Sequence, residues 1–168
     1  MSFVYPKVDT RTLVVGPSGS GKTYFVKHTI AKWLINNQIE KIYVHNDNKG
    51  EYSFVNKKLG VVNPLWTPLI GTSRVVHVYE NDSQYKALKD KMTNIVVSTS
   101  LITKDCFDNV VIFGPVNKET MHAIYDSFMN EIYSFENVCD FIQKATADKY
   151  SYAFISMKEE DKYRVSRV

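Results

Sequence analysis

The sequence predicts an α/β sandwich built around a mainly parallel β-sheet. Short runs rich in valine, isoleucine, tyrosine and phenylalanine alternate with segments whose apolar residues recur at helical spacing. Runs of this composition suit strands that are buried on both faces of a parallel sheet. The segment GPSGSGKT follows one such run and precedes one helical pattern, which is the strand–loop–helix order of α/β folds.

Size and composition fit one globular domain covering residues 1–168, because 44% of the residues are apolar and 23% are charged. The formal net charge of +3 permits a nucleic-acid partner without requiring one. Cys106 and Cys139 lack metal-ligand spacing and indicate a reducing setting. We expect a soluble protein, since no signal sequence and no apolar run long enough to cross a bilayer is evident.

Six runs are predicted to form strands. The first, Thr12–Val15, stands directly before GPSGSGKT. The others are KIYVH, RVVHVY, NIVVS, NVVIF and SYAFISM, at residues 41–45, 74–79, 94–98, 109–113 and 151–157. Residues 47–72 carry glycine and proline without a clear period, which predicts a long connection that is functional or mobile.

Three segments have helical spacing. The first is Lys22–Asn36, with Val26, Ile30, Trp33 and Leu34 on one face. Asn117 is a predicted N-cap for a second helix that carries Met121, Ile124, Tyr125, Phe128 and Ile132. A third pattern follows Ser134 and carries Phe135, Val138, Cys139 and Ile142.

GPSGSGKT matches the P-loop pattern G-x-x-x-x-G-K-[ST] at every defined position, and we call Gly16–Thr23 the P-loop. In this pattern the backbone N–H groups and the helix N-terminus hold phosphates. The residues expected to bind the nucleotide are Gly16, Pro17, Ser18, Gly19, Ser20, Gly21, Lys22 and Thr23. Lys22 would reach the β- and γ-phosphates of ATP, and the Thr23 hydroxyl would hold Mg²⁺.

Hydrolysis needs an acidic residue at the end of a neighbouring strand. Among the predicted strands only VVHVYEND runs into acidic residues, at Glu80 and Asp82. We take Glu80 as the candidate catalytic residue beside Lys22, and Asp82 as a candidate metal ligand. The alternative is a strand that ends in an Asx-type turn. Tyr24 is a further candidate contact for the base, with packing within the helix as its alternative.

Several segments together resemble the genome-packaging ATPases of the FtsK/HerA clade, found in large DNA viruses, virophages and related transposons. They are GPSGSGKT with its helix ending in WLIN, KIYVHND, the stretch from NIVVSTS to HAIYDSF, and the closing DKYSYAFISMKEEDKYRVSR. The resemblance covers most of the chain. It implies the P-loop NTPase fold, a three-layer sandwich with a mainly parallel sheet.

The same resemblance implies a function and partners. It predicts an ATP-driven homo-oligomeric ring that moves double-stranded DNA into a capsid, with capsid proteins as partners and the host cytoplasm or the virion as its location. Ser98 or Ser100 would stand near the family's sensor position, where a glutamine is common. An arginine of one subunit would complete the next subunit's site. From the residues alone, the nearest candidates for contact with the DNA backbone are Lys57, Lys58, Lys86, Lys89 and Lys91, with an ordinary solvated surface as the alternative.

The sequence departs from the family between the third and fourth predicted strands. The family carries an acidic strand end and a basic loop there, whereas residues 81–93 form only a short predicted helical link. We therefore expect a chain without a clear Walker B segment, with a shortened or degenerate catalytic half. Two alternatives to the packaging ATPase stay open. One is a small nucleoside or nucleotide kinase, and the other is a nucleotide-binding structural subunit that does not hydrolyse.

Overall fold

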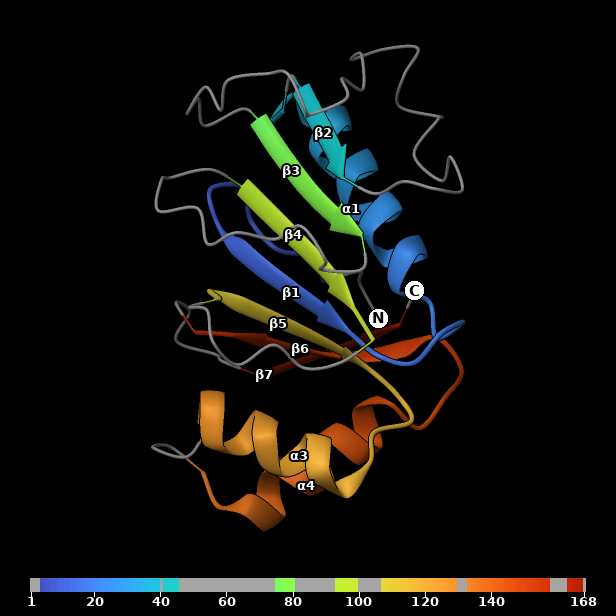
Figure 1. Ribbon diagram of the computed structural model, residues 1–168, viewed down its shortest axis with the longest axis vertical. Helices are drawn as coiled ribbons and strands as arrows, with labels where there is room; N and C mark the ends of the chain where they lie inside the picture. The colour runs from blue at the N-terminus through green and yellow to red at the C-terminus, as the bar shows by residue number, and fades with distance from the viewer. Residues whose placement is uncertain are drawn as a thin grey trace.

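The computed structural model describes residues 4–39, 41–45, 75–80, 93–99, 107–129, 133–157 and 163–167. In these ranges seven strands form one sheet (Figure 1). The strands are β1 (Arg11–Val15), β2 (Lys41–His45), β3 (Val75–Glu80), β4 (Thr93–Ser98), β5 (Asn109–Phe113), β6 (Ser151–Ser156) and β7 (Tyr163–Arg167). The helices are α1 (Lys22–Ile35), α3 (Lys118–Ile124), the π-helical turn η3 (Tyr125–Met129) and α4 (Phe135–Ala145).

The strand order in the sheet is β2-β3-β4-β1-β5-β6-β7. The first five strands in this order run parallel, and β6 and β7 continue the sheet in antiparallel pairs. This arrangement confirms the mainly parallel sheet. The carboxyl ends of the five parallel strands meet at one edge, and the P-loop leaves the sheet there from the central strand β1 (Figure 1).

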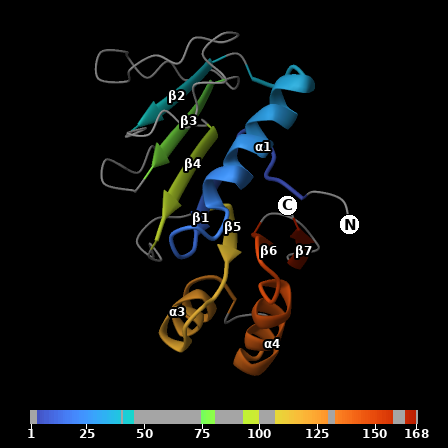
Figure 2. The same cartoon turned by 90° about the vertical axis from the view of Figure 1, so that its right-hand side faces the viewer.

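Helix α1 covers one face of the sheet (Figure 2). Its buried face carries Phe25, Val26, Ile30 and Trp33, which pack against strand residues such as Val14, Val97 and Val111. The indole of Trp33 donates a hydrogen bond to the carbonyl of Pro6 (3.1 Å), so the N-terminal segment is fixed against the same core. The predicted apolar face of this helix is confirmed, with Leu34 partly buried at its edge.

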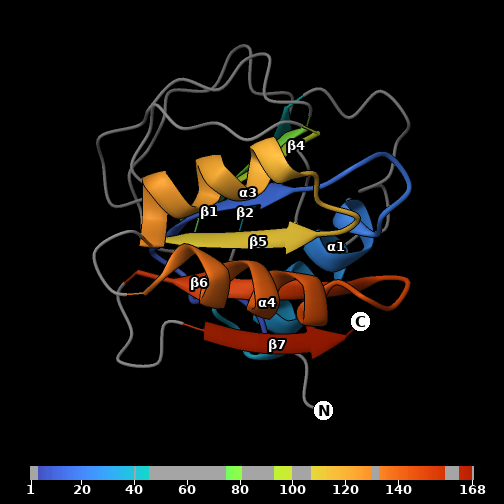
Figure 3. The same cartoon turned by 90° about the horizontal axis from the view of Figure 1, so that it is seen from below.

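Helices α3 and α4 cover the opposite face (Figure 3). Met121, Ile124, Val138 and Ile142 pack there against Leu13, Val15, Val110 and Ile112. Successive residues of a strand point to opposite faces. Val14 therefore packs in the core under α1, whereas Leu13 and Val15 pack in the core under α3 and α4. The molecule is therefore a three-layer α/β sandwich.

The predicted N-cap at Asn117 is confirmed, and Ser134 caps the third helix in the same way. The Asn117 side chain accepts a hydrogen bond from the amide of Thr120 (2.8 Å), and the Ser134 hydroxyl accepts one from the amide of Asn137 (3.3 Å). The second helix differs from the prediction, because α-helical geometry ends at Ile124 and a π-helical turn follows. A π-turn has i→i+5 hydrogen bonds and is wider than an α-helical turn, and Ile124 and Met129, at its two ends, lie in the same core.

Several predicted features lie outside the described residues. They are the connection 47–72, the link after Glu80 with Asp82, the sensor candidate Ser100, the lysines named above, Arg74, Ile132 and Cys106. In the described ranges, no helix combines the length and the apolar character that crossing a membrane requires.

Candidate functional site

The P-loop begins where β1 ends, at the carboxyl edge of the sheet. The amide of Gly16 donates a hydrogen bond to the carbonyl of Ser98, the last residue of β4 (3.2 Å). The backbone of Gly16 passes so close to Phe113 of β5 that a Cβ built on it would lie 2.7 Å from the Phe113 Cβ. Only glycine fits between the two neighbouring strands, and this fixes where the P-loop leaves the sheet.

Two glycines turn the P-loop back toward α1. Gly19 and Gly21 have φ angles of 76° and 107°, a region that residues with a side chain rarely adopt. Ser20 closes the turn, because its amide and its hydroxyl both donate to the carbonyl of Pro17, at 3.3 and 2.7 Å. Gly21 is the N-cap of α1 and accepts the amide of Phe25 (3.0 Å). The first amides of α1 have no acceptor within the helix, and this first turn follows directly on the P-loop.

Lys22 carries the positive charge of this site. Its ammonium donates hydrogen bonds to the carbonyls of Gly16 (2.6 Å) and Pro17 (2.7 Å), and the residue is only 9% exposed. The ammonium therefore lies against the concave backbone of the loop. A buried cation beside helix N–H groups creates a strong local attraction for anions.

Thr23 and Tyr24 continue the first turn of α1. Thr23 is half-buried. Tyr24 is 55% exposed, and its ring lies 4.8 Å from the ring of His28, measured between centroids. Tyr24 thus packs on the outer side of the helix against the next turn and contributes nothing to the sheet core. Its contact with a base stays a prediction.

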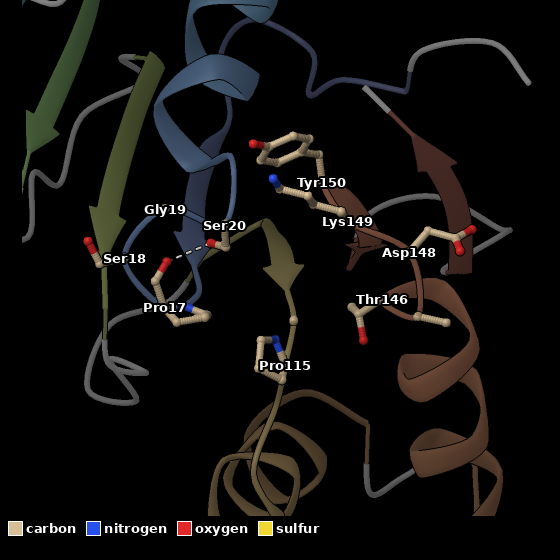
Figure 4. A pocket seen from close by; sticks show the side chains of 11 residues that line it. Pro17, Ser18, Gly19, Ser20, Pro115, Thr146, Asp148, Lys149 and Tyr150 are labelled. Carbon is tan, nitrogen blue, oxygen red and sulfur yellow. Dashed lines mark hydrogen bonds between the residues drawn. The ribbon is translucent and has the colours of Figure 1, made fainter.

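A pocket of about 390 Å³ opens beside the P-loop (Figure 4). One wall is the P-loop backbone from Pro17 to Ser20, and the floor is Gly114-Pro115 after β5. The facing wall is Thr146–Tyr150, which we call the 146–150 loop and which joins α4 to β6. The volume falls within the range of small-molecule sites, about 300–1,000 Å³.

The other end of the site lies on β3 and β4. Glu80 is the last residue of β3 and pairs in register with Val97 of β4, which pairs in turn with Val14 of β1. Neighbouring strands are about 4.8 Å apart, so the Cα atoms of Glu80 and Val14 are separated by about 10 Å. Ser98 is buried at the end of the intervening strand. The predicted catalytic position is thus at the P-loop edge of the sheet.

Neither a protein-family model nor a curated protein matches the sequence. Solved structures do match the fold over nearly its whole length. The genome packaging NTPase B204 from Sulfolobus turreted icosahedral virus 2 in complex with AMPPCP aligns with a TM-score of 0.67 and 14% identity, over 97% of this chain and 100% of that chain. Its complex with ATP-gammaS gives a TM-score of 0.66 and 15% identity, over 96% and 98% of the two chains.

The DNA-packaging ATPase B204 from Sulfolobus Turreted Icosahedral Virus gives a TM-score of 0.65 and 14% identity, over 95% of this chain and 98% of that chain. At this level of identity the similarity concerns the fold. The fold is that of a P-loop NTPase. The fold class and the place of the P-loop within it are as predicted from GPSGSGKT and the strand–helix alternation.

Sequence reasoning missed the far wall of the pocket. The 146–150 loop is a short polar stretch, TADKY, between a helix and a strand, and nothing in its composition distinguishes it from an ordinary connection. Only the sheet order brings it to the P-loop, because β5 lies directly beside β1 and β6 is the next strand along. Tyr150, with a φ of 65° and 45% exposure, is the residue of this wall with the most unusual environment.

Proposed function

We propose that this chain binds a nucleoside triphosphate with Mg²⁺ at the P-loop, hydrolyses it, and uses the energy to move double-stranded DNA into a viral capsid. The observation that carries the proposal is the arrangement of Lys22. Its ammonium lies inside the loop, 2.6 Å from the carbonyl of Gly16 and 2.7 Å from that of Pro17.

This arrangement suits a polyphosphate for electrostatic reasons. Phosphate oxygens are strong acceptors that carry charge, and hydrogen bonds from an ammonium to such acceptors are among the stronger ones in proteins. Backbone N–H groups at a helix N-terminus supply further donors. Lys22 would bind the β- and γ-phosphates, and the backbone from Gly16 to Gly21 would bind the rest of the chain of phosphates.

Mg²⁺ fits the same site through oxygen ligands. The described residues contain no group of three or more histidine, cysteine, aspartate or glutamate side chains placed to hold a metal ion. Mg²⁺ usually combines one or two protein oxygens with substrate phosphates and water. The half-buried Thr23 offers a hydroxyl beside Lys22, and Asp82 is the candidate second ligand. When bound, the ion would neutralise charge on the phosphates.

Glu80 is the proposed catalytic carboxylate. It ends β3 in register with Val97, one strand away from β1, so a carboxylate there would orient a water molecule toward the γ-phosphate. As the water oxygen bonds to phosphorus, the Glu80 carboxylate would accept a proton from the water, and the bond to the β–γ bridging oxygen breaks. Lys22 would stabilise the charge that develops on the departing diphosphate. Ser98, buried at the end of β4, is the proposed sensor residue.

The wider function is supported by the sequence resemblance and by the viral packaging NTPases that share the fold. We propose one P-loop NTPase domain over residues 1–168, assembled as a homo-oligomeric ring in the host cytoplasm or the virion, with DNA and capsid proteins as partners. All seven strands, from Arg11 to Arg167, belong to one sheet, which supports the single domain.

The decisive experiment is ATP turnover with and without double-stranded DNA. We expect turnover that DNA stimulates and that Lys22→Ala abolishes. Lys32→Ala is the matched control, because Lys32 is an exposed lysine in the last turn of the same helix. Turnover indifferent to both DNA and Lys22→Ala would refute the proposal. Tight ATP binding without any turnover would favour the non-hydrolysing subunit, and phosphate transfer to a nucleoside would favour the kinase.

A further inference from the structure

The pocket beside the P-loop lies on the side of β1 that is away from the proposed catalytic residue. In the sheet, β4 and β3 with Glu80 lie on one side of β1, whereas β5 and β6 lie on the other. The pocket is lined by Gly114-Pro115 after β5 and by the 146–150 loop before β6. A triphosphate with its γ end toward β3 therefore points its α end toward this pocket.

Tyr150 is the aromatic residue of the facing wall, the 146–150 loop. Its Cδ1 atom lies 3.3 Å from the position of a Cβ built on Gly21, the N-cap of α1. The ammonium of Lys149 lies 4.8 Å from the centre of the Tyr150 ring. The ring is thus held against the P-loop on one side while 45% of the residue stays exposed. Figure 4 shows Tyr150 and Lys149 on the α1 side of the pocket, with Pro17 and Pro115 opposite Thr146.

The 146–150 loop is held in place by its own hydrogen bonds. The amide and the hydroxyl of Ser151 both donate to the carbonyl of Asp148, at 3.1 and 2.6 Å. The hydroxyl of Thr146 donates to Ile142 in the last turn of α4 (2.7 Å), and the side chain of Thr146 packs so closely on Gly114 that a Cβ there would lie 2.7 Å away. Tyr150 itself has a φ of 65°, which is uncommon for a residue with a large side chain.

We propose that this pocket holds the nucleoside of the bound nucleotide, with the base against the ring of Tyr150. The proposal rests on the proposed function, because it takes the phosphates to lie in the P-loop. An exposed aromatic ring in a fixed position is suited to a flat base, which covers the ring from water at little entropic cost. Every base has a π-face, so such stacking tolerates different bases.

Stacking gives the expected size of the effect. Removing an aromatic partner of a base costs about 1–3 kcal/mol, and a cost of about 1.4 kcal/mol, toward the lower end of that range, corresponds to a tenfold loss of affinity. A ligand without a base would lose nothing. Comparing a nucleotide with inorganic tripolyphosphate therefore separates the contribution of the pocket to the affinity from that of the P-loop.

The test is isothermal titration calorimetry of the full chain with Mg²⁺-ATP and with Mg²⁺-tripolyphosphate. Three variants are compared with the wild type. Tyr150→Ala removes the ring, and Tyr150→Phe keeps it. Tyr133→Ala is the matched control, because Tyr133 is also exposed, at 39%, and lies just before the start of α4, whereas Tyr150 lies after its end. Thermal unfolding of each variant identifies any that fails to fold.

We expect Tyr150→Ala to weaken ATP binding about tenfold and to leave tripolyphosphate binding within about twofold of the wild type. Tyr150→Phe and Tyr133→Ala should match the wild type for both ligands. Equal losses for both ligands, or no loss for ATP, would overturn the inference while leaving the P-loop proposal intact. If Tyr150→Ala fails to fold, Tyr150→Leu takes its place with the same expected contrast. A wild-type chain that binds neither ligand would overturn the proposed function itself.

Discussion

The ammonium of Lys22 lies 2.6 Å from the carbonyl oxygen of Gly16, the first residue of the same loop. One hydrogen bond thus joins the end of β1 to the start of α1 across the mouth of the P-loop. The loop is closed by its own lysine, by the turn at Ser20 and by the anchor from Gly16 to Ser98. A loop with this many internal bonds is organised before any ligand arrives, and this reduces the entropic cost of binding.

Gly16→Ala should destabilise the protein more than Gly19→Ala. A Cβ at Gly16 would meet the Phe113 Cβ at 2.7 Å and the Phe113 carbonyl oxygen at 3.0 Å, and a backbone atom cannot rotate away. We expect a loss of about 2–3 kcal/mol in the free energy of unfolding, typical of overpacking. Urea denaturation at equilibrium measures this directly.

Gly19→Ala is the comparison for that experiment. A Cβ at Gly19 would meet nothing within 4 Å, although its φ of 76° disfavours alanine. The expected loss is about 1 kcal/mol, from the backbone alone. Equal stability of the two variants would contradict the close packing of Gly16 against Phe113 of β5.

Glu80→Gln should stop hydrolysis and leave binding unchanged. The amide has the shape of the carboxylate but does not accept a proton, so loss of a general base costs about 10²–10⁴-fold in rate. Single-turnover hydrolysis and ATP titration measure the two quantities separately. Glu119→Gln, in the first turn of α3, is the control. Unchanged hydrolysis in Glu80→Gln would remove Glu80 from the catalytic role.

ATP and GTP should bind with affinities within about tenfold of each other, because stacking on an aromatic ring discriminates weakly between bases. Two hydroxyls of the pocket are already donors in internal bonds, that of Ser20 to Pro17 and that of Thr146 to Ile142. Competition of GTP against labelled ATP gives the ratio. A preference of a hundredfold or more would contradict this prediction, because it would require a specific hydrogen bond to one of the two bases.

The sequence could predict the central strand, the P-loop and α1 because each depends on neighbours along the chain. Val14 and Val15 are branched apolar residues before a glycine-rich motif, and Ile30 and Trp33 follow at helical spacing. The caps at Asn117 and Ser134 are likewise local, since each side chain bonds an amide three residues ahead. These features needed no knowledge of tertiary structure.

The sheet order and the pocket wall could not be predicted in the same way. The position of β4 between β1 and β3 places Glu80 relative to the P-loop, and no local pattern encodes it. Tyr150 and Gly21 are about 130 residues apart in the sequence, yet the Tyr150 ring packs against Gly21 in the fold. The π-turn after Ile124 could not be predicted from the sequence either, because the apolar residues there fit an α-helical spacing equally well.

Calorimetry of Mg²⁺-ATP binding to the purified wild type and to Lys22→Ala tests directly whether Gly16–Thr23 is the phosphate site. Removing the ammonium deletes a charged hydrogen-bond partner of the phosphates, which costs about 2–3 kcal/mol and weakens binding by about 30- to 150-fold. Lys32→Ala should bind as the wild type does. If Lys22→Ala bound Mg²⁺-ATP as tightly as the wild type, or if the wild type bound no nucleoside triphosphate, Gly16–Thr23 would not be the phosphate site.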